Sequence, residues 1–242
     1  MELGLSMNLS SSFDNQGFLV VDGTQGIAPG VILLAAQRNA KVVFTAQAEC
    51  EAEADQILAA ARAAGLSDRV SSIITSLADE EAVEQLFDTA LERLPGLNVL
   101  IHNLEPTAVL EPKPLVEISL AEWNGVLSTE VGAPFKLAQR AVEEYLFGQA
   151  GGRIVYVAYA GNGKIISPAS YAAARTGLRA LVRCITKEFG RREVACNAVV
   201  VHQDHGRATS DELIESVLFL ASTESTYVNG EFLDIGSRNV TR

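Results

Sequence analysis

The sequence is poor in cysteine, in positive charge and in long apolar runs. Its three cysteines, Cys50, Cys184 and Cys196, follow no regular spacing, which indicates incidental thiols in a reducing cytoplasm. It has 19 basic and 30 acidic residues, and the net charge of −11 argues against nucleic acid and anionic membranes as partners. The richest apolar run, residues 31–36, is far shorter than the ~20 residues of a membrane-spanning helix, so we expect a soluble cytoplasmic protein.

The amino terminus lacks the marks of a secretory signal. Residues 1–16 have neither a basic start nor a long apolar segment, and we expect them to form a short flexible lead-in. The rest of the chain shows no linker and no break in composition, and 48% of all residues are apolar. These features predict one globular domain over residues 17–242.

Predicted strands and helices alternate along the whole domain. Strands are expected over residues 17–22, 41–45, 70–75, 98–102, 153–157, 194–201 and 231–235, and helices over 31–37, 49–64, 78–93, 120–147, 169–189 and 211–220, with a kink at Pro134. The strands are continuous apolar runs, which is typical of a parallel sheet that is covered on both faces. The fold class is therefore α/β: a single doubly wound, Rossmann-like domain with a parallel sheet of about seven strands and helices on both faces.

The segment 152–177 carries the clearest chemical signal. It reads as a strand, a polar loop and a helix that opens at Ser167 and Pro168. Tyr171 and Arg175 are four residues apart on that helix, so their side chains share one face. A fixed cation beside a phenol stabilises the tyrosinate, and we expect it to lower a pKa that is normally about 10.

Several motifs resemble the short-chain dehydrogenase/reductase family, and within it most closely the 3-oxoacyl-acyl-carrier-protein reductases. They are Gly152-Arg153-Ile154-Val155, Tyr171, Thr176-Gly177, Glu188-Phe189-Gly190 and Asn197-Ala198-Val199. The resemblance implies catalysis by a strand serine, a tyrosine, a lysine four residues later and an asparagine in the preceding long helix. Here only Tyr171 is retained. The lysine position is Arg175, the serine position falls on Ala158 or Tyr159, and the asparagine position is Glu130.

The substitutions at these catalytic positions change their chemistry. Ala158 cannot donate the hydrogen bond that a serine gives to a substrate oxygen, and the bulky ring of Tyr159 would project into the substrate space. Arg175 keeps the positive charge but does not release a proton at biological pH. Glu130 places a carboxylate in the cleft, where it could hold water or pair with Arg175.

The resemblance also implies a dinucleotide site with the loop Thr-Gly-x-x-x-Gly-Ile-Gly. Gly23, Gly26 and Ile27 resemble this loop, but Asp22 replaces the threonine, one spacer residue is missing and Ala28 replaces the last glycine. A carboxylate at Asp22 would add negative charge near two phosphates. The glycines alone are also consistent with an ordinary tight turn from strand to helix.

The other cofactor positions have changed as well. Ala46-Gln47-Ala48 offers no acid or arginine for the ribose, and Ser76-Leu77, His102-Asn103-Leu104-Glu105 and Val201-His202 replace the remaining contact motifs. If a dinucleotide binds, the resemblance places it at Gly23, Gly26, Ile27, Gln47 and Asn103. Packing positions thus match the family, whereas ligand positions do not.

The segment after Val201 is short. The chain passes through residues 202–206 and enters the next helix by Asp211, so the substrate lid of the relatives is almost absent. His202, Asp204 and His205 are metal-binding residue types, but their crowded spacing and the lack of a fourth ligand indicate a polar loop. We expect no metal site.

Three functional hypotheses follow. The favoured one is a catalytically impaired structural or regulatory subunit that binds no cofactor. It would form a homodimer, a homotetramer or a mixed oligomer with an active paralogue through the two long helices, whose apolar residues are Val126, Val131, Phe135, Leu178, Leu181 and Val182. The first alternative is an NAD(P)H-dependent oxidoreductase that uses Tyr171 and Arg175. The second is a non-redox lyase similar to the halohydrin dehalogenases, which also use a tyrosine and an arginine.

Overall fold

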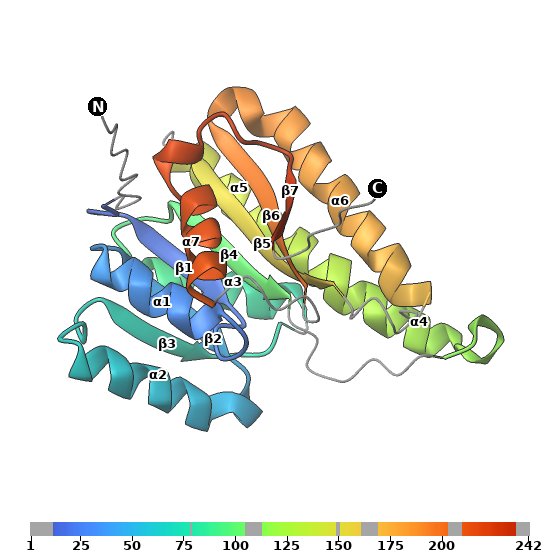
Figure 1. Ribbon diagram of the computed structural model, residues 1–242, viewed down its shortest axis with the longest axis horizontal. Helices are drawn as coiled ribbons and strands as arrows, with labels where there is room; N and C mark the ends of the chain where they lie inside the picture. Colours follow the sequence, from blue (N-terminus) through green and yellow to red (C-terminus); the bar gives the residue numbers. More distant parts are fainter. Residues whose placement is uncertain are drawn as a thin grey trace, which may run out of the picture.

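The computed structural model describes residues 12–77, 79–104, 113–148, 151–160, 169–202 and 210–235 (Figure 1). Within these ranges the sheet has seven strands in the order β3-β2-β1-β4-β5-β6-β7, and all neighbouring strands are parallel. The strands are β1 Gly17–Val21, β2 Lys41–Ala46, β3 Val70–Ile74, β4 Val99–Leu104, β5 Gly152–Ala160, β6 Val194–His202 and β7 Phe232–Ile235. The expected α/β class and parallel sheet are confirmed.

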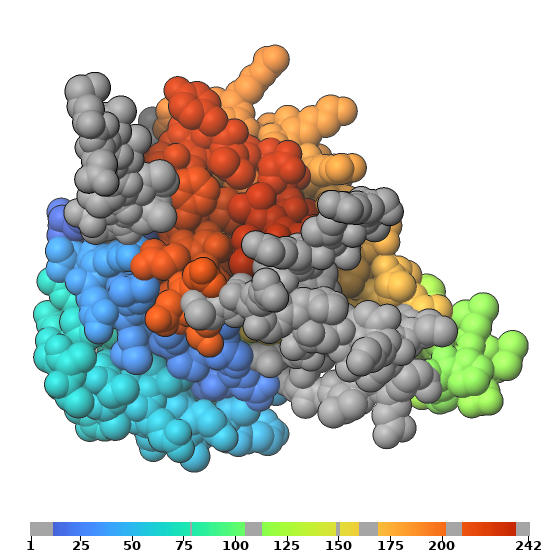
Figure 2. All heavy atoms as spheres, viewed as in Figure 1, coloured from blue at the N-terminus to red at the C-terminus, as the bar shows by residue number. Residues whose placement is uncertain are grey.

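Helices cover both faces of the sheet. They are α1 Ala28–Gln37, α2 Glu51–Ala63, α3 Glu80–Leu91, α4 Leu120–Leu127, α5 Ala133–Gly148, α6 Ala169–Phe189 and α7 Ser210–Ala221. The helices α1, α2 and α7 pack on the face turned toward the viewer in Figures 1 and 2, and α3, α5 and α6 pack on the other. Because both faces of the sheet are buried, the central strands consist mainly of buried apolar residues, as is typical of a parallel sheet.

The strand order places the site. The chain runs outward from β1 to β3 in one direction and from β4 to β7 in the other, so the order reverses between β1 and β4. In open α/β sheets, ligands bind at the carboxyl ends of the strands on either side of such a reversal. The glycine-rich turn after β1 and the ends of β4 and β5 therefore meet at one edge of the sheet.

The long central helix is interrupted where the sequence predicts a kink. The α-helical pattern of α4 ends at Leu127, and a π-helical turn over Ser128–Gly132 precedes α5, whose second residue is Pro134. Proline has no N–H and breaks the regular ladder of helical hydrogen bonds, which accounts for the interruption just before it. Glu130 lies within the π turn.

Phe13 in the segment before β1 packs against the body of the domain. Phe13, which we assigned to the flexible lead-in, is 1% exposed, and its ring packs against that of Phe18 with the centroids 4.9 Å apart. Its backbone N–H donates to the carbonyl of Arg38 at 2.6 Å. The apolar side chain of Phe13 thus anchors the chain before β1. Residues 1–11 lie outside the described ranges.

None of the helices within the described ranges combines the length and the apolar character that crossing a membrane requires.

Candidate functional site

The glycine-rich turn between β1 and α1 lies tightly against β2. The N–H of Gly23 donates to the carbonyl of Thr45 at 2.9 Å, and the N–H of Asp22 donates to the Thr45 hydroxyl at 2.9 Å. A Cβ atom on Gly23 would lie 2.9 Å from Ile32 and 2.9 Å from Phe44, so only glycine fits there. Gly26 has φ +58°, in the left-handed region that favours glycine. Both glycines therefore have a structural role in the turn.

Two backbone donors at the start of α1, those of Ile27 and Ala28, have partners within the protein. The N–H of Ile27 donates to the hydroxyl of Tyr159 at 3.4 Å, and the N–H of Ala28 donates to the carbonyl of Gln25 at 3.2 Å. Pro29 has no N–H to donate. The tyrosine comes from the carboxyl end of β5, is only 5% exposed, and reaches across the sheet to the first turn of α1.

Asn103 connects the same tyrosine to the glycine-rich turn. Its side-chain amide nitrogen lies 3.2 Å from the carbonyl oxygens of Asp22 and Gln25, and its amide oxygen accepts from the Tyr159 hydroxyl at 3.1 Å. Asn103 is buried at the end of β4. Tyr159 and Asn103 thus join β4, β5 and the turn into one hydrogen-bonded unit.

Asp22 points toward a buried histidine. One carboxylate oxygen of Asp22 lies 3.5 Å from His102 Nε2, and His102 is 2% exposed. Asp22 directly follows β1, and His102 lies within the neighbouring strand β4, where it is in register with Val21. This pair was not predicted from the sequence, because it depends on the register between β1 and β4.

Tyr171 directs its hydroxyl at the backbone. It donates to the carbonyl oxygen of Tyr159 at 2.9 Å and accepts a hydrogen bond from Arg175, whose guanidinium also lies 4.6 Å from the centroid of the Tyr171 ring. Burial raises the pKa of Tyr171, and Arg175 only partly opposes this effect. Arg175 acts to lower this pKa, as expected, but desolvation of the phenol outweighs the cation, so the net direction is upward.

Glu130 forms an ion pair with Arg175. The Glu130 carboxylate lies 3.5 Å from an Arg175 nitrogen, and the two side chains are 13% and 20% exposed. Burial raises the pKa of Glu130, while Arg175 and His102 act in the opposite direction. The same arginine nitrogen lies 3.4 Å from the carbonyl oxygen of Leu104. The pairing with Arg175 that we considered for Glu130 is observed.

The two candidates for the serine position face opposite layers. Ala158 packs in the layer of α3, α5 and α6, whereas Tyr159 packs in the layer of α1, α2 and α7. The bulk of Tyr159 thus lies on the side of the glycine-rich turn. Neither residue places a hydroxyl beside that of Tyr171, which bonds to the backbone oxygen of residue 159.

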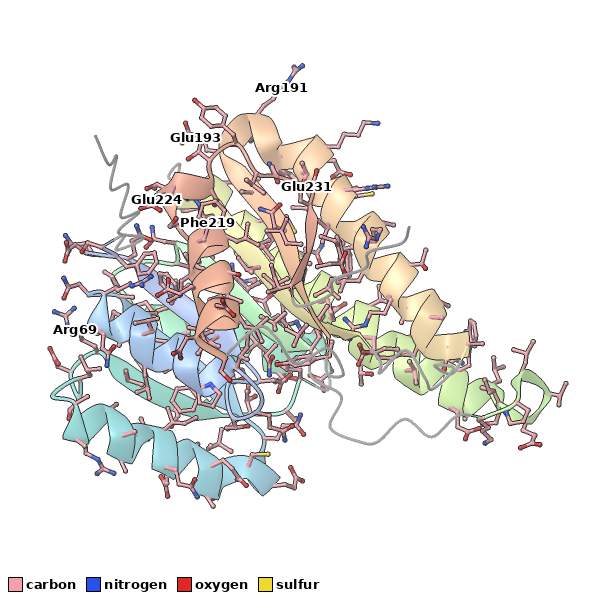
Figure 3. The ribbon with its side chains drawn as sticks, viewed as in Figure 1. Arg69, Arg191, Glu193, Phe219, Glu224 and Glu231 are labelled. Atoms are coloured by element: carbon pink, nitrogen blue, oxygen red, sulfur yellow. The ribbon has the colours of Figure 1, made fainter. Side chains whose placement is uncertain are left out.

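The structure brings together eight of the nine residues expected for the site. Gln47 is the exception: it is exposed at the start of the turn before α2, and its side chain makes no capping hydrogen bond. Asp204 and His205 lie outside the described residues, as do Ser167 and Pro168. Among the residues that are described, no cluster of His, Cys, Asp and Glu could hold a metal ion. Arg191 and Glu193, labelled in Figure 3, mark the opposite edge of the sheet, just before β6 begins.

Comparisons with known proteins agree on one family. The family model described as enoyl-(acyl carrier protein) reductase matches residues 21–203. The 3-oxoacyl-[acyl-carrier-protein] reductase FabG of Escherichia coli is 26% identical over 250 residues, which cover 93% of this chain and 97% of that protein. A short chain dehydrogenase from Mycobacterium smegmatis is 27% identical, with a TM-score of 0.79 over 96% of this chain and 99% of the other. A citronellol catabolism dehydrogenase of Pseudomonas aeruginosa, 24% identical, has the same fold, with a TM-score of 0.78 over 93% and 95% of the two chains.

Proposed function

The chain belongs to the short-chain dehydrogenase/reductase family, and from that premise we propose that it is a catalytically impaired member that serves as a structural or regulatory subunit. The observation that carries this proposal is the hydrogen bond between the Ile27 N–H and the Tyr159 hydroxyl, 3.4 Å long. In dinucleotide-binding folds, the amides at this helix terminus hold the pyrophosphate. Here a side chain of the protein itself takes that place.

The remaining donors at this terminus support the same proposal. Ala28 is bonded to the carbonyl of Gln25, and Pro29 supplies no N–H. Asp22 adds a carboxylate to the same turn, which would repel two phosphates. These residues do not fit a pyrophosphate as they stand, so we propose that the protein works without NAD(P)H.

The catalytic positions support a loss of hydride-transfer chemistry. A general acid must have its proton within reach of the substrate. The Tyr171 proton is instead donated to the Tyr159 carbonyl at 2.9 Å, and Arg175 stands in place of the lysine. Glu130 replaces the asparagine and pairs with Arg175. The Tyr171 hydroxyl is thus bonded within the protein, whereas Glu130 Oε2 and the Nε and Nη1 atoms of Arg175 are buried without hydrogen-bond partners among the described residues.

A thermal-shift series with NADPH and NADH tests this proposal. A ligand at one hundred times its dissociation constant stabilises the folded state by about 2.7 kcal/mol. We expect no shift of the melting temperature at millimolar concentrations of either cofactor. A saturable shift would instead favour the first alternative, an active NAD(P)H-dependent oxidoreductase.

That alternative is favoured by two observations. The relatives named above are reductases and dehydrogenases, and Tyr171 and Arg175 are in contact on α6. It predicts oxidation of NADPH in the presence of a 3-oxoacyl thioester. It also predicts that Tyr171→Phe abolishes that activity.

The halohydrin-dehalogenase-like alternative rests on the same contact between Tyr171 and Arg175. It predicts release of a proton from a halohydrin without any cofactor, and loss of this reaction in Tyr171→Phe. Absence of proton release in the unaltered protein would rule this reading out.

We further propose that the protein assembles through α4, α5 and α6. Leu120 is 74% exposed on α4 and Phe135 is 50% exposed on α5, at an edge where α4 projects from the body of the molecule (Figure 2). Leu178 and Val182, which we assigned to this apolar face, are 1% and 0% exposed because they pack against the sheet. We also propose that the protein is cytoplasmic. Co-purification from the native host distinguishes a homomer from a mixed oligomer with an active paralogue.

A further inference from the structure

We propose that Tyr159 is a built-in plug of the dinucleotide site. Its hydroxyl accepts the hydrogen bond of the Ile27 amide that a phosphate oxygen would otherwise accept, and removal of this side chain restores dinucleotide binding. This inference rests on the proposed function and names the single side chain that closes the site. It follows from the position of Tyr159 in β5, from its burial and from its hydrogen bonds.

Because side chains alternate between the two faces along β5, the side chain of Tyr159 points toward the site. Val155, Val157 and Tyr159 point into the layer of α1, α2 and α7, and Ile154, Tyr156 and Ala158 point into the opposite layer. Residue 159 is the last of its set with a described side chain, so it lies nearest to the carboxyl end of the strand. The tyrosine side chain is long enough to bring its hydroxyl to the Ile27 N–H.

The ring of Tyr159 is held by apolar neighbours. Tyr159 belongs to the same buried cluster as Ile27, Ala28 and Val31 of the α1 region and Val201 of β6, and it is 5% exposed. A phosphate could approach the Ile27 amide only if this ring left the cluster. The plug is therefore part of the core, and its displacement would expose apolar surface to water.

The hydroxyl of Tyr159 satisfies its partners without adding charge. It accepts from the Ile27 N–H at 3.4 Å and donates to the Asn103 amide oxygen at 3.1 Å. A phosphate in the same place would bring negative charge toward Asp22, whose carboxylate faces His102 at 3.5 Å. A neutral hydroxyl is thus compatible with the carboxylate of Asp22 in the turn, and the Ile27 amide keeps a hydrogen-bond partner without a ligand.

Shortening this side chain tests the plug directly. In Tyr159→Ala the Ile27 amide loses its partner and the space of the ring is vacated, so we expect NADPH to raise the melting temperature in a saturable way. We expect an apparent affinity at least about tenfold tighter than that of the unaltered protein. Tyr159→Leu, which keeps apolar volume but does not reach Ile27, should gain binding in the same direction.

Tyr156→Leu is the matched control. Tyr156 lies on the same strand, is 0% exposed and donates its hydroxyl to the Pro134 carbonyl at 3.0 Å on the other face of the sheet. It should lose stability without any gain of NADPH binding. Circular dichroism and gel filtration establish that each variant is folded before it is titrated.

The outcomes separate the two proposals. If NADPH does not shift the melting temperature of the unaltered protein but binds a folded Tyr159 variant, the proposed function and the plug both stand. If NADPH shifts the melting temperature of neither the unaltered protein nor the two folded variants at residue 159, the plug is overturned and the impaired subunit stands. If the unaltered protein binds NADPH, the proposed function is overturned, and the plug with it. If Tyr159→Ala does not fold, Tyr159→Leu decides by the same criterion.

Discussion

Three polar side chains of the site, those of Asn103, Tyr159 and Tyr171, are bonded to one another or to the backbone of the protein. Asn103 binds two carbonyl groups of the glycine-rich turn, Tyr159 binds Ile27 and Asn103, and Tyr171 binds the carbonyl of residue 159. A buried hydrogen bond stabilises the fold modestly, but a buried partner left unsatisfied is costly. Single substitutions at these residues should therefore affect stability.

Tyr171→Phe is the first such test. The substitution removes one donor to the Tyr159 carbonyl and one of the acceptors of Arg175, so we expect the free energy of unfolding to fall by about 1–2 kcal/mol. Urea denaturation measures this loss, with Tyr156→Phe as a control that removes one buried hydroxyl of the same kind. Unchanged stability together with loss of a reductase or dehalogenase activity would contradict the structural role.

Glu130→Gln tests the buried ion pair through its pH dependence. Burial raises the pKa of Glu130 above 4.5, its value in the unfolded chain, so the folded state holds this proton more tightly. The contribution of Glu130 to stability therefore falls as the pH rises from about 4.5 through the raised value. Since glutamine does not titrate, the difference in unfolding free energy, original minus variant, should fall with rising pH.

Denaturation with urea from pH 3 to pH 8 checks this slope. Glu122→Gln is a control of opposite sign, because hydrogen bonds from Lys113 and Ser119 lower the pKa of Glu122 to about 2. The stability that Glu122 contributes is present above about 4.5 and is lost as the pH falls toward 2. A difference for Glu130 that rises with pH would mean that Arg175 outweighs burial.

At the scale of elements, α4 depends on its amino-terminal cap. None of its residues is buried, and Ser119 and Glu122 form a capping box at its start. Because little core packing holds α4, local hydrogen bonds decide whether its first turn is formed. The only tryptophan of the chain, Trp123, lies in this first turn and reports on it.

Ser119→Ala should fray α4. Loss of a serine cap costs about 1 kcal/mol, so we expect faster amide exchange in the first turn of α4 and stronger acrylamide quenching of Trp123. Ser216→Ala in α7 is the control, because Ser216 bonds to the carbonyl of Glu212 within an exposed helix face and caps nothing. Equal exchange rates in the two variants would show that α4 is held by other contacts.

The elements themselves could be predicted because their signals are local. The apolar runs of β1 and β2 and the helix α6 follow directly from periodicity and composition. The extension of β5 to Ala160 was missed, because Tyr159 and Ala160 carry no strand signal without their pairing to β6. The contact of Asp22 with His102 was missed for a similar reason: it depends on the register of strands far apart in the sequence.

At the scale of the whole molecule, the resemblance to 3-oxoacyl-acyl-carrier-protein reductases drawn from short motifs is confirmed by relatives that cover nearly the full chain. The direction of the Tyr159 side chain could not be predicted, since the motif leaves open whether residue 158 or 159 takes the serine position. The alternation of side chains along β5 sets the direction of Tyr159, and it places the tyrosine among the residues of α1.

Assembly is the prediction that belongs to this scale. If α4, α5 and α6 form an interface, the protein should run as a dimer or tetramer in light scattering, and the double variant Leu120→Glu, Phe135→Glu should run as a smaller species. Ile74→Glu is the control, because Ile74 is 42% exposed on β3, at the opposite edge of the sheet. A monomer before any substitution would contradict this interface.

A crystal grown or soaked with millimolar NADPH tests the central claim most directly. We predict that the Tyr159 hydroxyl remains on the Ile27 N–H and that no dinucleotide is seen at the carboxyl edge of the sheet. A dinucleotide extended across that edge, with Tyr159 displaced from Ile27 and the nicotinamide beside Tyr171, would contradict the account.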